Sequence, residues 1–288
     1  MKLRSLYLSG LLSIFAIAAQ AQQLLLPQSS PKATVSQTIG LTEISVKYNT
    51  PSVKGREIWG KLVPYGKLWR TGANEATVVT FSEDVVVQGE PLKAGTYSLF
   101  TIPETHDNWT IIFNKNPNQW GTFDYKESDD VLRVPVQAIP SEFHETLFFS
   151  FTNIKRTGGQ LNINWERIRI PIQIETEVDQ KVIANIKKAL SEAKENNWTI
   201  YAEAVNYLIQ NNKEPELALQ WINKSISISD NFYNNWLKAQ LLAQHKEYSE
   251  AVALVKKAMK LGELEKESYS AYATDLELAL REWRILQN

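Results

Sequence analysis

Residues 168–174 read Ile-Arg-Ile-Pro-Ile-Gln-Ile, with an isoleucine at every second position. Successive side chains of a β-strand point to opposite faces, so this spacing predicts a strand with one apolar face on a core and one polar face in water. Pro171 has no backbone N–H to donate, which favours an edge position for this strand. The chain is therefore expected to bury the faces of β-sheets against one another.

Similar short runs precede this stretch through the first half of the chain. Gly40 and the pair Gly158-Gly159 mark turns, and residues 82–84 have the composition of a hairpin turn. About ten short strands with almost no helical period predict an all-β antiparallel sandwich, jelly-roll-like or barrel-like in form. The other runs lie at residues 33–38, 41–48, 76–81, 85–87, 96–102, 109–113, 131–136, 146–151 and 161–165.

The periodicity becomes helical near Thr176. The pattern Lys-Glu-x-x-x-Ala at residues 213–218 returns at residues 246–251, an offset of 33, which resembles the tetratricopeptide repeat. Pro215 at the start of a helix in the first copy fits that repeat less well, so a plain helical bundle remains the alternative. Either reading predicts an all-α helical-hairpin domain. Its first apolar stripe is Val178, Val182, Ile183, Ile186, Leu190 and Ala193.

The first 21 residues have the composition of a secretory signal peptide. Lys2 and Arg4 precede an apolar segment at residues 6–19, and Ala19-Gln20-Ala21 is a cleavage signal, so cleavage is expected between Ala21 and Gln22. A retained membrane anchor is the alternative, but the segment's 14 positions are fewer than the roughly 20 that a spanning helix needs.

The expected organisation has four parts. These are a signal peptide at residues 1–21, a linker at 22–31, a β-sandwich domain at 32–175 and a tetratricopeptide-like helical tail at 176–288. After cleavage the mature chain is expected to be soluble, without a membrane span, in the periplasm or outside the cell.

The composition narrows the possible chemistry. The formal net charge of −1 provides no basic field for nucleic acid, and the absence of cysteine excludes disulfides, thiolate catalysis and iron–sulfur clusters. The three histidines, His106, His144 and His245, lack the spacing of a zinc site. There is no Gly-x-Ser-x-Gly, no phosphate-binding glycine loop and no dinucleotide motif. No cofactor and no metal are expected.

One loop concentrates side chains that could bind a ligand. Residues 65–75 read Tyr-Gly-Lys-Leu-Trp-Arg-Thr-Gly-Ala-Asn-Glu. The tryptophan could offer an apolar face, the arginine a planar fork of donors, and the amide and the acid directional hydrogen bonds. The ligand-binding candidates are Arg56, Tyr65, Trp69, Arg70, Asn74 and Glu75. A structural alternative stays open, in which Arg70 pairs with Glu75 or Glu57 while Trp59 and Trp69 fill the end of the sandwich.

Several blocks of the sequence resemble one known family. They are Pro-Ser-Val-Lys-Gly-Arg at residues 51–56, residues 65–77, residues 93–101, Trp-Thr-Ile-Ile-Phe-Asn at 109–114 and Gln-Trp-Gly at 119–121. In this order they are similar to the domain of unknown function twenty-nine eleven, typical of exported proteins of Bacteroidota. The resemblance runs from about residue 28 to residue 174 and leaves the helical tail outside. It implies a Gram-negative envelope location, and it brings no established activity or catalytic residue.

Three functional hypotheses follow. The first is an exported, non-catalytic module that binds a glycan, a peptide or a small molecule at the β-domain. The second is a hydrolase of cell-envelope polymers with Glu75 or Glu57 as acid or base, which needs a second carboxylate across a cleft. The third is a scaffold whose helical tail binds a protein partner.

Overall fold

The computed structural model of the protein describes residues 26–105 and 107–287. The chain separates into two compact units, Met1–Thr176 and Glu177–Asn288. The expected signal peptide, its cleavage point at Ala21 and Gln22, and His106 lie outside the described residues.

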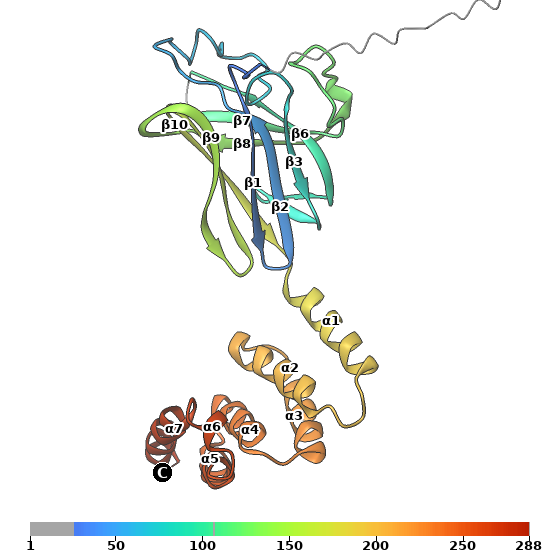
Figure 1. The fold of residues 1–288 in the computed structure, drawn as a ribbon, viewed down its shortest axis with the longest axis vertical. Helices are drawn as coiled ribbons and strands as arrows, with labels where there is room; N and C mark the ends of the chain where they lie inside the picture. The colour runs from blue at the N-terminus through green and yellow to red at the C-terminus, as the bar shows by residue number, and fades with distance from the viewer. Residues whose placement is uncertain (1–25, 106, 288) are drawn as a thin grey trace, which may run out of the picture. The chain divides into compact units, whose positions relative to one another are not determined.

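The first unit consists of two antiparallel sheets that face each other across one core (Figure 1). The six-stranded sheet has the order β1-β2-β3-β6-β7-β8, and the four-stranded sheet the order β5-β4-β10-β9. The larger sheet contains β1 (Lys32–Ile39), β2 (Thr42–Asn49), β3 (Thr77–Phe81), β6 (Gly95–Ile102), β7 (Asn108–Asn114) and β8 (Asp130–Gln137). The smaller sheet contains β4 (Val85–Val87), β5 (Glu90–Leu92), β9 (Ile139–Lys155) and β10 (Gly158–Thr176). The predicted antiparallel β-sandwich followed by helices is confirmed.

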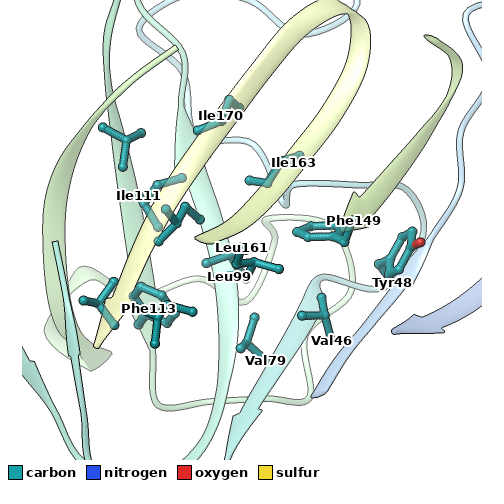
Figure 2. Packing of buried hydrophobic residues seen from close by; sticks show 14 of the residues in the cluster. Val46, Tyr48, Val79, Leu99, Ile111, Phe113, Phe149, Leu161, Ile163 and Ile170 are labelled. Atoms are coloured by element: carbon teal, nitrogen blue, oxygen red, sulfur yellow. The ribbon is translucent and has the colours of Figure 1, made fainter. Parts of the chain in front are cut away.

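Alternating side chains from both sheets build the core. Figure 2 shows Leu161 and Ile163 of β10 among Leu99, Phe113 and other side chains of the larger sheet. Each fully buried aliphatic or aromatic side chain of this kind contributes about 1.5–3 kcal/mol of burial free energy. The alternating isoleucines of β10 also belong to this core, because Ile170, Ile172 and Ile174 are all fully buried.

The edge position expected from Pro171 is wrong, because β10 lies between β4 and β9. The pairing of β10 with β9 reaches Arg169, and its pairing with β4 begins at Ile174. Pro171 therefore falls between the two registers, where a missing N–H breaks neither of them. Residues 161–165 and 168–174, expected as two strands, form one strand that bulges at Glu166, a residue with a φ of 55°.

The second unit is made only of helices and their connections in its described part. Asn197 and Asn231 cap two of the helices by accepting a hydrogen bond from a backbone N–H of the first turn. Pro215 occupies the first turn of another helix, where a missing N–H costs nothing. The helices are α1 (Asp179–Glu192), α2 (Trp198–Asn211), α3 (Pro215–Ile228), α4 (Phe232–Gln244), α5 (Tyr248–Gly262), α6 (Lys266–Tyr269) and α7 (Ala273–Leu286).

Small residues allow these helices to pack closely. Ala218 and Ser225 of α3 are fully buried, and so are Ala251 and Ala258 of α5, the residues 33 positions further on. The helices pack as successive hairpins, α2 with α3 and α4 with α5 (Figure 1). Over the described residues, no helix combines the length and the apolar character needed to cross a membrane.

Candidate functional site

An open cavity of about 540 Å³ lies on the outer face of the six-stranded sheet. The floor of the cavity is formed by outward-facing side chains of β2 and β3. Val46 and Val79 point into the core, so their neighbours Lys47 and Val78, which pair with each other across the two strands, point outward into the cavity. One wall comes from the connection between β7 and β8. The lining comprises Lys32, Ala33, Thr34, Lys47, Tyr48, Asn49, Glu75, Ala76, Val78, Pro117, Asn118, Gln119, Trp120 and Asp124.

Asn114 holds this wall at its base. It is the last residue of β7, its side chain points to the outer face, and it is fully buried. Its Nδ2 donates to the Asp130 carboxylate at 2.9 Å and to the Lys126 carbonyl at 3.1 Å. Its Oδ1 accepts from Gln119 Nε2 at 2.9 Å and from the Asn116 N–H at 3.1 Å. Through these four hydrogen bonds, the buried Asn114 amide ties the first residues of the β7–β8 connection to its last residues.

Tyr125 closes the other end of the loop. Its ring meets Phe100 edge to face with centroids 5.1 Å apart, covering apolar side chains of the outer face. Its hydroxyl donates to Asp130 Oδ2 at 2.6 Å. Burial, and then the hydrogen bond to Asp130, raise the pKa of Tyr125 to about 12. The loop is therefore a packed wall of the cavity.

A polar network forms the cavity rim around Glu75. Its Oε1 lies 2.8 Å from Lys32 Nζ, and its Oε2 accepts from Asn49 Nδ2 at 3.1 Å. The hydrogen bond from Lys32 is the main cause that lowers the pKa of Glu75. Asn74, in the left-handed region with a φ of 57°, donates to the Asn49 side chain at 3.4 Å. The Asn74 carbonyl accepts from the Gly121 N–H at 3.0 Å, which joins this network to the wall.

Four side chains that line the cavity have an exposed surface or a polar group without a partner among the described residues. The indole of Trp120 is 56% exposed. Lys47 and Asp124 form no ion pair with any other described residue. Gln119 is only 4% exposed, and its Oε1 has no hydrogen-bond partner. These groups give the cavity unused donors, unused acceptors and one aromatic surface.

Trp69 lies in the core, at 7% exposure, and not at the cavity. It stacks on Trp165 at 5.8 Å and 20° between planes, and meets Trp59 edge to face at 5.6 Å. Trp109 completes the group through Trp59, with centroids 4.9 Å apart. The indole N–H of Trp69 donates to the Gly72 carbonyl at 3.1 Å. This side chain therefore packs within the sandwich and leaves little surface exposed.

Arg70 is half-buried and does not line the cavity. Within the described residues it forms no ion pair with Glu57 or Glu75, and its Nε is buried without a hydrogen-bond partner. Burial lowers the pKa of its guanidinium. A Cβ added to Gly121 would lie 3.7 Å from Arg70 Nη1, so the arginine lies close to the Trp120 turn.

The remaining candidates are spread over the loop before β3. Arg56 donates to the carbonyls of Ser52 and Val53, so it holds its own turn. Tyr65 is partly exposed, and its ring occupies the space beside Gly60. Neither side chain lines the cavity, and neither does Glu57. Of the six candidates from the sequence, Glu75 lines the cavity and Asn74 supports its rim.

Sequence reasoning overlooked the cavity residues Lys47, Gln119, Trp120 and Asp124. One signal was present, because Trp120 is a large aromatic residue in a stretch of turn-forming residues, Asn114 to Asp124. Strand alternation cannot place such a residue, so the sequence left open whether Trp120 lies in the core or at the surface. In the described part of the chain, no cluster of His, Asp or Glu side chains could hold a metal ion.

The fold and the cavity define the first unit as a two-layer antiparallel β-domain with an open pocket on the outer face of its larger sheet. Residues 30–174 match the family model described as "Protein of unknown function (DUF2911)". The match covers just over half of the chain, and the protein belongs to this family. Comparison with curated proteins and comparison with solved structures each gave no match.

Proposed function

We propose that the protein is an exported, non-catalytic binding module whose β-unit takes a small ligand in the Trp120 cavity. The observation that carries the proposal is that one open cavity is lined by an exposed indole and by Lys47 and Asp124, neither of which has an ion-pair partner over residues 26–105 and 107–287. The volume of about 540 Å³ lies within the range of about 300–1,000 Å³ typical of small-molecule sites. These three residues line the cavity, whereas Trp69 and Arg70, which were candidates from the sequence, do not.

The wall and the rim support this proposal because they are already ordered. Asn114, Tyr125 and Asp130 fix the loop, and the Lys32–Glu75 pair fixes the rim. A site whose side chains are held before binding loses less conformational entropy when the ligand arrives. The cavity can therefore bind without rearranging the sheet.

A fragment screen followed by amide and indole NMR tests the location of the site. Ligands are expected to shift the resonances of Lys47, Gln119 and the Trp120 indole, and to leave those of Trp69 unchanged. Binders whose shifts map only to other parts of the chain would contradict the proposal. Trp120→Ala should weaken binding of every fragment that shifts the cavity, while Tyr65→Ala, which alters an exposed aromatic outside the cavity, should not.

Hydrolysis is the second candidate function, because Glu75 and Asp124 line the same cavity. The lowered pKa of Glu75 keeps it ionised, which suits a base or nucleophile and not a general acid at neutral pH. Its engagement by Lys32 and Asn49 favours a structural role. Turnover of envelope polysaccharides or peptides that disappears in both Glu75→Gln and Asp124→Asn would establish the enzyme and replace the binding module.

The helical unit is proposed to be tetratricopeptide-like and to bind a protein partner. The helix pairs α2–α3 and α4–α5, and the buried small residues 33 positions apart, support this reading. Loss of partner capture on deletion of the chain after Thr176, with an intact β-unit, is the expected result. Retained capture by the truncated chain would count against it.

The proposed setting is the envelope of a Gram-negative bacterium, in keeping with the resemblance to exported Bacteroidota proteins. The signal sequence ending at Ala21 supports it. Fractionation of a native host should find the mature chain, starting at Gln22, in the periplasm or the medium; an uncleaved cytoplasmic chain would contradict it.

A further inference from the structure

We infer that the ligand of the Trp120 cavity is a neutral, polyhydroxylated molecule, a short glycan seated on the indole ring. The inference rests on the proposed function and specifies its ligand class. It follows from the charge balance of the lining, from its unused hydrogen-bonding groups and from the exposed aromatic surface.

The charges around the cavity cancel. Lys32 and Glu75 neutralise each other at 2.8 Å, and Lys47 and Asp124 contribute one cation and one anion that have no ion-pair partner in the part of the chain that the structure describes. An anionic ligand would need an excess of cations to replace its lost hydration, and a cationic ligand an excess of carboxylates. This lining offers neither, so a ligand without net charge matches it best.

The unused groups include donors and acceptors. Lys47 can donate, Asp124 can accept, and the Asn118 amide, whose side chain makes no hydrogen bond to the described residues, can do both. Gln119 Oε1 also lacks a hydrogen-bond donor among the described residues, but this atom is buried behind the lining and is not counted among the groups that a ligand can reach. A hydroxyl both donates and accepts, so a molecule bearing several hydroxyls can satisfy such a mixed set.

The aromatic surface supplies the apolar part of the contact. Trp120, which is 56% exposed, lines the same cavity as the apolar residues Ala76 and Val78. A sugar ring has C–H groups on its faces and hydroxyls around its edge, so it can lie on an indole while its rim bonds to polar neighbours. Tryptophan suits this role because it combines a large apolar surface with a polar N–H.

The test titrates the full mature chain with a panel of small ligands by calorimetry and NMR. The neutral probes are cellotriose, maltotriose, mannotriose and xylotriose; the others are tri-galacturonate, inorganic phosphate and tetra-alanine. A neutral trisaccharide is expected to shift the Trp120 indole and to bind at least tenfold more weakly to Trp120→Ala. Phe123→Ala is the matched control, because Phe123 is a neighbouring aromatic, 86% exposed, that does not line the cavity. That variant should bind with unchanged affinity.

The other outcomes separate this inference from the proposed function. If only tri-galacturonate or phosphate shifts the cavity, and Lys47→Gln abolishes the effect, the cavity binds but the neutral-glycan assignment is overturned. Tetra-alanine as the sole binder, pairing with the free edge of β1, overturns it equally. Failure of every neutral trisaccharide at millimolar concentration refutes the inference. The proposed function fails separately, when fragments bind only outside the cavity.

Discussion

The two tryptophans Trp69 and Trp120 should respond to substitution in opposite ways. Trp69→Ala removes a 7%-exposed ring, two aromatic contacts with centroids 5.6 and 5.8 Å away, and one hydrogen bond of 3.1 Å. Each aromatic pair contributes about 0.5–1.5 kcal/mol beyond burial and the hydrogen bond about 1 kcal/mol. Together with the cavity left behind, the variant should lose about 3–5 kcal/mol of unfolding free energy.

Trp120→Ala should change the unfolding free energy by no more than about 0.5 kcal/mol, because its exposed ring leaves no buried cavity. Its backbone pairing with Glu75 is kept in alanine. Urea denaturation of the full chain measures both variants. Hydrogen exchange of peptides from β3 and β6 assigns the shifted transition to the first unit.

A loss of less than about 1 kcal/mol in Trp69→Ala, or an equal loss in Trp120→Ala, would show that Trp69 is not the core residue of the two. Trp69→Phe gives an intermediate check. It keeps a ring in the core and removes the N–H that Gly72 accepts, so its loss should lie between those of the two alanine variants.

Three further predictions concern the charged and polar groups near the cavity. Arg70→Met should change the unfolding free energy by less than about 1 kcal/mol in urea denaturation, because it removes a half-buried charge that has no ion-pair partner among the described residues. Glu75→Gln should cost less than about 1 kcal/mol at neutral pH, since the pair with Lys32 is partly exposed. The lowered pKa of Glu75 means that this contribution is present above the ordinary glutamate range and is lost as the pH falls through the lowered pKa, so the two stability-against-pH curves should converge in acid. Tyr125→Phe removes a 2.6 Å bond to the Asp130 carboxylate and should cost about 1.5–3 kcal/mol, with faster hydrogen exchange in residues 115–129; unchanged exchange would contradict its role in the wall.

The strand periodicity of the first unit could be predicted because burial is local to each strand. The isoleucines at every second position from Ile170 to Ile174 are all buried, and the strands of the larger sheet begin and end close to the predicted runs. The break expected near Glu166 is a bulge within one strand, which alternation alone cannot distinguish from a turn. The short strand β5 escaped prediction because it has three residues and contains Pro91.

The site was less predictable, because it depends on which sheet face the β7–β8 loop covers. Asn74 and Glu75 could be proposed because they lie in one polar and aromatic loop. Their proximity to Trp120, more than 40 positions away in the sequence, could not be predicted. Trp69 and Trp120 have the same chemistry in the sequence. Only the packing of Trp69 against Trp165 assigns one of them to the core and leaves the other at the surface.

Hydroxyl-radical footprinting, with and without the tightest-binding ligand of the screen, tests most directly whether Trp120 rather than Trp69 meets the ligand. Without ligand, Trp120 should be oxidised rapidly and Trp69 only slightly, because their exposed fractions are 56% and 7%. Ligand should then protect Trp120 and Lys47 and leave the oxidation of Phe123 unchanged. Ligand-dependent protection of residues outside the cavity, with Trp120 oxidised at the same rate as before, would contradict it.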